Sequence, residues 1–155
     1  MSFLDEIKEI ETNRNDRENI VIDEILNYFK DKLYDDKFKD NLKNNYIKRA
    51  INDSKDYCEL KVEFWEYHSG CSSTYIYVGG CGKFELKKDS CDSFDSYYDY
   101  KGIRLYDIHK RICSKLSDLL KTRLAELGLQ VVATERDDDK FRFDYYKERI
   151  KIKWR

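Results

Sequence analysis

Residues 57–88 constrain the fold of this 155-residue chain more than any other segment. Apolar and polar residues alternate there with period two between clusters of Gly and Ser, a pattern typical of half-buried strands. We therefore predict three consecutive strands that pair as an antiparallel meander. One face of this sheet is predicted to belong to the core: Cys58, Leu60, Val62, Phe64, Thr74, Ile76, Val78, Phe84 and Leu86.

A three-stranded sheet with one apolar face is not stable alone in water, so the meander needs a cover. Residues 103–127 have the strongest helical repeat of Leu and Ile in the chain, and Gly128 is placed as a C-terminal stop. We predict that this long amphipathic helix covers the meander. The glycine-rich residues 78–83 lack the spacing of a phosphate-binding loop, and we interpret them as a hairpin turn.

Residues 1–53 are predicted to be helical. Four apolar residues share one face of a first short helix, which the polar residues 12–15 are expected to end: Phe3, Leu4, Ile7 and Ile10. A longer helix is expected from Asp16 to near Tyr34, and a third from Asp36 to about Ala50. Because these helices need a surface to pack on, we expect them to cover the outer face of the meander.

Residues 129–154 are predicted to form C-terminal strands, at 130–135, at 141–145 and around Ile150 and Ile152. The apolar phase slips between Tyr145 and Ile150, which predicts a bulge or a short turn at 146–149. The whole chain, residues 1–155, is predicted to be a single domain of the α+β class with mostly antiparallel pairing.

Composition excludes several classes of protein. Charged residues make up 39% and hydrophobic residues 41% of the chain, which argues against disorder throughout. No apolar run approaches the ~18 residues of a spanning helix, so we expect no membrane association. Five cysteines with no export signal favour free thiols over disulfides. The expected location is the cytoplasm, or the cytoplasm of a host cell if a phage encodes the chain.

Residues 89–101 have no period and are interpreted as a loop. Exposed aromatic residues usually have a use, and the neighbouring carboxylates can pair with a basic partner. The loop is therefore the predicted protein-binding surface, through Asp92, Phe94, Asp95, Tyr97, Tyr98, Asp99 and Tyr100.

Nucleic acid is the alternative partner. The net charge is −1, but residues 103–155 carry fourteen Lys and Arg against nine Asp and Glu. Basic residues alternate along one face of the last strand, where they can either track phosphates or protect a sheet edge from pairing: Lys147, Arg149, Lys151, Lys153 and Arg155. Trp65, Tyr67, Tyr75 and Tyr77 on the outer face of the meander are of the type that stacks on bases.

Two His/Cys pairs form a zinc-compatible pattern, His68 with Cys71 in the first hairpin and His109 with Cys113 one helical turn apart. The simpler interpretation is that Cys58 and Cys113 are small core residues and that the other thiols are incidental. Neither histidine belongs to a nucleophile motif. We predict no metal, no cofactor and no enzymatic activity, and a metal- or thiol-dependent enzyme remains the third hypothesis.

These observations favour a small non-enzymatic intracellular protein that binds and regulates or inhibits another macromolecule, most simply a protein. The surplus of residues with AT-rich codons, the small size and the lack of a catalytic motif point to a phage or another mobile element, whose anti-defence inhibitors are one such class. The partner and the oligomeric state do not follow from the sequence.

Overall fold

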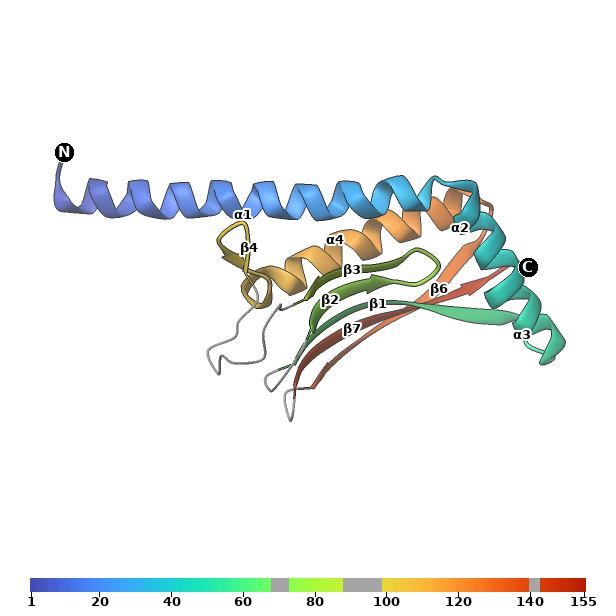
Figure 1. Cartoon of the computed structure of the whole chain (residues 1–155). Coiled ribbons are helices and arrows are strands. Elements are labelled where there is room, and N and C mark those ends of the chain that lie inside the picture. The colour runs from blue at the N-terminus through green and yellow to red at the C-terminus, as the bar shows by residue number, and fades with distance from the viewer. Residues whose placement is uncertain (68–72, 88–98, 140–142) are drawn as a thin grey trace.

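A computed structural model describes residues 1–67, 73–87, 99–139 and 143–155 of the chain, and the fold is α+β as predicted (Figure 1). The helices are α1 (Phe3–Leu33), α2 (Asp36–Asn41), the π-helical segment η1 (Leu42–Ile47), α3 (Lys48–Asn52) and α4 (Leu105–Glu126). The strands are β1 (Tyr57–Tyr67), β2 (Ser73–Val78), β3 (Gly82–Lys87), β4 (Asp99–Tyr100), β5 (Ile103–Arg104), β6 (Gln130–Asp139) and β7 (Phe143–Lys153).

The main sheet has the strand order β3-β2-β1-β7-β6, and each neighbouring pair is antiparallel. The predicted meander is confirmed as β1, β2 and β3, and its predicted core face is buried or packed against the core. The turn between β2 and β3 is the predicted hairpin, with Gly80 at φ 84. Strand β7 pairs with the whole length of β1, which the sequence pattern did not predict, and this pairing places β1 at the centre of five strands.

Helix α4 covers this sheet, as predicted. Its apolar stripe is buried against the strands, and it begins two residues later than expected because Ile103 and Arg104 pair with β4 in a two-stranded hairpin. The predicted stop is also confirmed. Gly128 has φ 82, and hydrogen bonds from Gly128 N to Ala125 O and from Leu129 N to Leu124 O close the helix as a Schellman motif.

The predicted break in the first helical region is wrong, because α1 is one helix of 31 residues. The polar residues 12–15 include neither Gly nor Pro, so nothing in them breaks a helix. Thr12 keeps its hydroxyl satisfied within the helix by donating to the Lys8 carbonyl oxygen at 2.9 Å.

The expectation that the N-terminal helices cover the outer face of the sheet is also wrong for α1. Helices α1 and α4 lie on the same side of the sheet (Figure 1). Helix α4 packs on β1, β7 and β6, while α1 packs on α4 and reaches the edge strand β3, where the Tyr28 hydroxyl donates to the Lys83 carbonyl oxygen at 2.9 Å. Only the α2-η1-α3 segment reaches the outer face, where the hydroxyls of Tyr46 and Tyr77 lie 3.2 Å apart. The apolar side of α1 is therefore buried against α4 and the edge of the sheet at β3 instead.

No bulge interrupts β7, contrary to prediction, since its register with β1 runs without a shift from Phe143 to Lys153. The apparent slip in phase arises because Tyr146 and Glu148 point toward the core. Glu148 is tolerated there because it forms an ion pair with Arg136, whose Nε lies 3.3 Å from Glu148 Oε1. The irregularity lies in β6 instead, between Val131 and Ala133.

Candidate functional site

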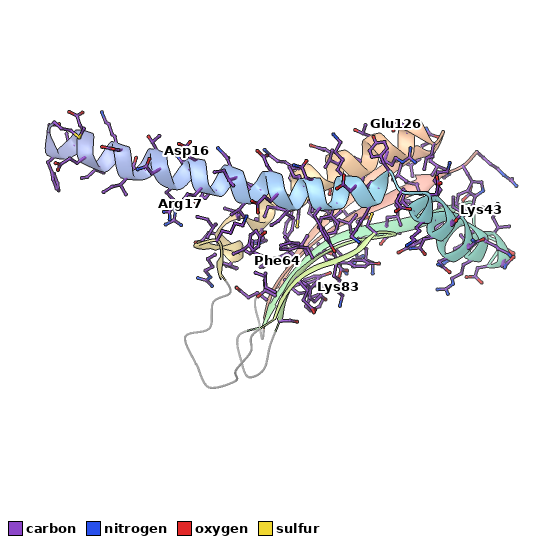
Figure 2. All side chains as sticks on the ribbon, turned by 45° about the horizontal axis from the view of Figure 1, so that its top comes forward. Asp16, Arg17, Lys43, Phe64, Lys83 and Glu126 are labelled. Atoms are coloured by element: carbon purple, nitrogen blue, oxygen red, sulfur yellow. The ribbon has the colours of Figure 1, made fainter. Side chains whose placement is uncertain are left out.

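The first three turns of α1 extend past the N-terminal end of α4 and stand clear of the sheet in both overall views (Figures 1 and 2). We call residues 3–13 the α1 arm. A capping box holds its start, with Asp5 N donating to Ser2 Oγ and Ser2 N donating to Asp5 Oδ2, both at 3.2 Å. The arm is therefore a helix with its own start signal, although none of the described helices lies opposite it.

The arm carries an exposed apolar stripe. Phe3 is 75% exposed, Leu4 65% and Ile10 68%, while Ile7 is half-buried. Each of the first three apolar positions has a buried counterpart eighteen residues later, which is five full helical turns. The pairs are Phe3 with Val21, Leu4 with Ile22 and Ile7 with Ile25. The stripe is thus the continuation of the face that packs on α4, beyond the point where α4 begins at Leu105.

Helices α1 and α4 run parallel, as successive contacts along both helices show. Arg14 contacts Asp107, Glu18 contacts Arg111, and the Tyr34 hydroxyl donates to Glu126 Oε1 at 2.8 Å. At about 1.5 Å per residue, α1 is about 46 Å long and α4 about 33 Å. The difference in length leaves the arm without a helix opposite it among the described residues.

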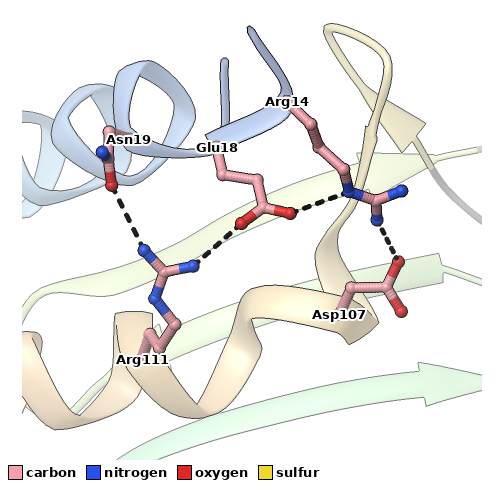
Figure 3. A network of polar contacts seen from close by, with 5 residues as sticks. All are labelled: Arg14, Glu18, Asn19, Asp107 and Arg111. Atoms are coloured by element: carbon pink, nitrogen blue, oxygen red, sulfur yellow. Dashed lines mark hydrogen bonds and ion pairs between the residues drawn. The ribbon is translucent and has the colours of Figure 1, made fainter. Parts of the chain in front are cut away.

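A network of polar contacts fixes α1 at the base of the arm (Figure 3). Glu18 Oε1 accepts from Arg14 Nε at 3.1 Å, and Glu18 Oε2 accepts from Arg111 Nη1 at 2.9 Å. Arg14 also reaches Asp107 at 3.3 Å, and Arg111 donates to the Asn19 side-chain oxygen at 3.2 Å. Because Glu18 is largely buried, these charge-assisted bonds hold the direction in which the arm leaves α4.

The arm is acidic. It carries Asp5, Glu6, Glu9 and Glu11 against one basic residue, Lys8. Among the residues that the structure describes, the three glutamates take part in no ion pair, in contrast to Glu18. The stripe is therefore flanked by carboxylates whose charge is free to attract a partner.

The predicted binding loop is only partly described. Residues 92–98, with the predicted Asp92, Phe94, Asp95, Tyr97 and Tyr98, lie outside the described residues, and Asp99 belongs to β4. Tyr100 packs edge-on against Phe84, with ring centroids 5.3 Å apart, and its hydroxyl donates to Glu24 Oε2 at 2.9 Å. Lys101 bonds the other oxygen, and these two hydrogen bonds, that of Lys101 first, lower the pKa of Glu24. Tyr100 thus ties β4 to α1, and the role of the rest of the loop stays a prediction.

The predicted basic stripe does lie along one face of β7, but β7 is an internal strand, so protection of a sheet edge is not its purpose. Its side chains are paired with acids on the same face. Lys147 lies 3.9 Å from Glu63, Arg149 lies 3.2 Å from Asp137, and Lys153 lies 3.5 Å from Asp56. Lys151 is placed over the Tyr57 ring at 4.0 Å, and Arg155 follows the strand exposed. A stripe neutralised in this way offers little charge to phosphates.

The outer-face aromatic residues form a row across the sheet. The Trp65 ring lies between Tyr75, with centroids 6.3 Å apart, and Tyr145, with centroids 4.3 Å apart. Lysines of the chain already occupy two of the ring faces: Lys83 lies 4.2 Å from the Tyr75 centroid and Lys147 lies 5.1 Å from that of Tyr145. The row is therefore engaged in contacts within the sheet, and the side chain of Tyr67 is outside the description.

The described residues include only one of the two His/Cys pairs, so the structure does not show whether the pairs meet. His68 and Cys71 lie outside the described residues, while His109 and Cys113 are buried between α4 and the sheet. His109 stacks on Phe64 with centroids 4.4 Å apart, and its Nδ1 is hydrogen-bonded to the Tyr106 carbonyl oxygen. Within the described ranges, His, Cys, Asp and Glu form no group of three or more that could share a metal ion. The four-residue zinc hypothesis stays untested.

The described thiols have a low tendency to ionise. Burial raises the pKa of Cys58 to about 11 and that of Cys81 to about 12, and it raises the pKa of Cys113 well above its ordinary value. Since the thiolate is the nucleophile, none of these three cysteines is poised for covalent chemistry at neutral pH.

The apolar residues of the arm are evident in the sequence, but their helical spacing predicted that they would be buried. Whether these residues are buried or exposed depends on the difference in length between α1 and α4. The predicted helix break at 12–15 made the first helix too short for this difference to be noticed. The repeat of eighteen residues between the arm and the buried half of α1 is visible in the sequence once the helix is taken as continuous.

Comparison of this chain with protein-family models, with curated proteins and with solved structures gives no match. None of the described helices combines the length and the apolar character that a membrane span requires.

Proposed function

We propose that this chain acts by binding another protein, as a non-enzymatic regulator or inhibitor of the kind that phages and mobile elements carry, and that the α1 arm is the binding surface. The observation that carries the proposal is the exposed stripe of Phe3, Leu4 and Ile10 on a helix that projects from the body. Burying one such side chain stabilises a complex by about 1.5–3 kcal/mol. Apolar residues grouped in this way on a surface are typical of interaction sites.

Preorganisation supports the same conclusion. The capping box starts the helix, and the network around Glu18 fixes its base. A partner that docks on the arm does not have to order it first, so little conformational entropy is lost on binding. A flexible tail with the same residues would bind more weakly for that reason.

The test is a comparison of two triple variants. The first, F3Q/L4Q/I10Q, removes the exposed apolar side chains of the arm and keeps good helix formers in their place. The second, I20Q/I51Q/V132T, is the matched control, because it removes three exposed apolar side chains elsewhere, which are 56%, 53% and 40% exposed. Both variants should melt close to the wild type, since surface substitutions usually change stability by less than about 0.5 kcal/mol.

Tagged wild type and both variants are used to capture proteins from cells that carry the gene, with quantification by mass spectrometry. We expect the arm variant to lose at least tenfold of the captured partner and the control variant to keep it. Equal capture by all three proteins, with the variants shown to be folded, would refute the arm as the binding surface.

A further inference from the structure

The packing of α4 on α1 indicates what kind of partner the arm accepts. Along α1, a stripe of apolar residues meets the apolar side of α4, and arginines of α4 reach the carboxylates and carbonyls beside that stripe. Arg111 donates to Glu18 at 2.9 Å, and Arg123 donates to the Leu33 carbonyl oxygen at 2.9 Å. Helix α4 therefore serves as an internal example of a helix that fits this face of α1.

The pattern continues into the arm. Glu11 precedes Glu18 by seven residues, which is close to two turns, so both carboxylates leave α1 in nearly the same direction. Glu18 takes Arg111 of α4, whereas Glu11 has no helix opposite it in the described part of the chain and no ion pair. The position opposite Glu11 therefore suits an arginine or a lysine from another molecule.

The charge of the arm selects between possible occupants. A second copy of the arm would bring four more carboxylates against the first four, which is repulsive. An anionic lipid surface is disfavoured for the same reason, since helices that lie on such membranes carry Lys and Arg on their polar face. A cationic helix of another protein satisfies both the stripe and the carboxylates.

We propose that the arm binds a cationic amphipathic helix of another protein, laid in line with α4 against the same face of α1, with a Lys or Arg of that helix paired to Glu11. This inference rests on the proposed function and specifies the chemistry of the partner. The apolar anchors are Phe3, Leu4, Ile7 and Ile10, and the helix-on-helix mode follows from the way α4 packs on the corresponding residues Val21, Ile22 and Ile25.

Two synthetic helical peptides test the inference. They share one leucine stripe, and the residues that flank it are Lys and Arg in one peptide and Glu in the other. Binding of each labelled peptide to the full chain is measured by fluorescence anisotropy at physiological ionic strength, where contacts beyond about 8 Å are largely screened. We expect saturable binding of the cationic peptide and at least tenfold weaker binding of the anionic one.

Two single variants localise the contact. E11Q removes the carboxylate beside the stripe, and E9Q is its matched control because Glu9 lies on the opposite side of the helix and carries the same charge. We expect E11Q to weaken the cationic peptide at least fivefold and E9Q to change its affinity less than twofold. Equal effects of the two variants would refute the pairing with Glu11.

The remaining outcomes separate this inference from the proposed function. If the anionic peptide binds as well as the cationic one, or neither binds while the arm variant still loses its cellular partner, the inference is wrong and the function stands. If the F3Q/L4Q/I10Q variant captures its partner as well as the wild type does, the proposed function is refuted, and the inference that rests on it is refuted as well. Arm-dependent dimers in sedimentation would overturn the inference in favour of a second copy of the chain. Arm-dependent binding to vesicles of phosphatidylglycerol would overturn it in favour of a membrane.

Discussion

Gly80→Ala should destabilise the fold by about 2–5 kcal/mol, through two separable effects. Gly80 lies in the β2–β3 turn at φ 84, a left-handed conformation that costs a residue with a Cβ roughly 1–2 kcal/mol. An added Cβ would also lie 2.7 Å from Cε2 and 3.0 Å from Cδ2 of Phe38. The Phe38 ring is fully buried, so this overpacking costs about 1–3 kcal/mol more.

The turn is held in place from the same side, so it cannot simply move away. The Asn41 side chain donates to the Gly80 carbonyl oxygen at 3.1 Å, and Gly80 N donates to the Tyr46 hydroxyl at 3.2 Å. These contacts from α2 and η1 fix the backbone of the turn against Phe38. A shift of the turn that relieved the clash with Phe38 would break these two hydrogen bonds.

Gly128→Ala is the matched control. Gly128 has φ 82, nearly the same conformation, but an added Cβ there has nothing within 4 Å. It should therefore show only the conformational cost of about 1–2 kcal/mol. Urea unfolding followed by tryptophan fluorescence gives the free energy of unfolding for each variant.

A double-mutant cycle with Phe38→Leu isolates the steric part. In that background the cost of Gly80→Ala should fall to that of Gly128→Ala, because the ring atoms that the Cβ meets are gone. Equal costs for Gly80→Ala and Gly128→Ala in the wild type, or an unchanged cost of Gly80→Ala in the Phe38→Leu background, would refute the argument from packing.

Three further predictions concern charge. Because burial raises the pKa of Cys58 to about 11 and of Cys81 to about 12 from the ordinary 9.0, the unfolded chain loses these protons first, and the free energy of unfolding should fall as pH rises from about 9 toward 12. Urea midpoints across this range should fall less steeply for C58A/C81A, and identical slopes would contradict the prediction. Glu18→Gln should lower the free energy of unfolding by about 1 kcal/mol, because Arg14 and Arg111 are half-exposed and water replaces part of the interaction that they lose. Amide hydrogen exchange should then become faster at the base of the arm. Unchanged exchange there would count against a stabilising role of the network. Replacing Lys147, Arg149, Lys151 and Lys153 with Gln should lower the melting temperature, since the acidic residues on the same face lose their ion pairs. Labelled RNA or DNA should bind the wild type only weakly and with a steep dependence on salt. Tight binding that resists salt would contradict this.

The features that the sequence predicted correctly are those that depend on local patterns. Alternation with period two identified β1, β2 and β3 and the correct core face of each, because a strand side chain has only two directions to take. The helical repeat and Gly128 identified α4 and its end, because the stop depends on one residue that tolerates a positive φ. The hairpin turn before β3 followed from its glycines in the same way.

The tertiary structure decided whatever depends on what a segment meets. Glu148 breaks the apolar phase of β7, yet the strand continues, because Arg136 on β6 compensates the buried carboxylate. The same holds for the candidate site. Phe3 and Leu4 have the spacing of buried residues, and only the length of α4 relative to α1 leaves them exposed. A sequence determines which face of a helix is apolar, whereas the exposure of that face depends on a neighbour almost a hundred residues away in the chain.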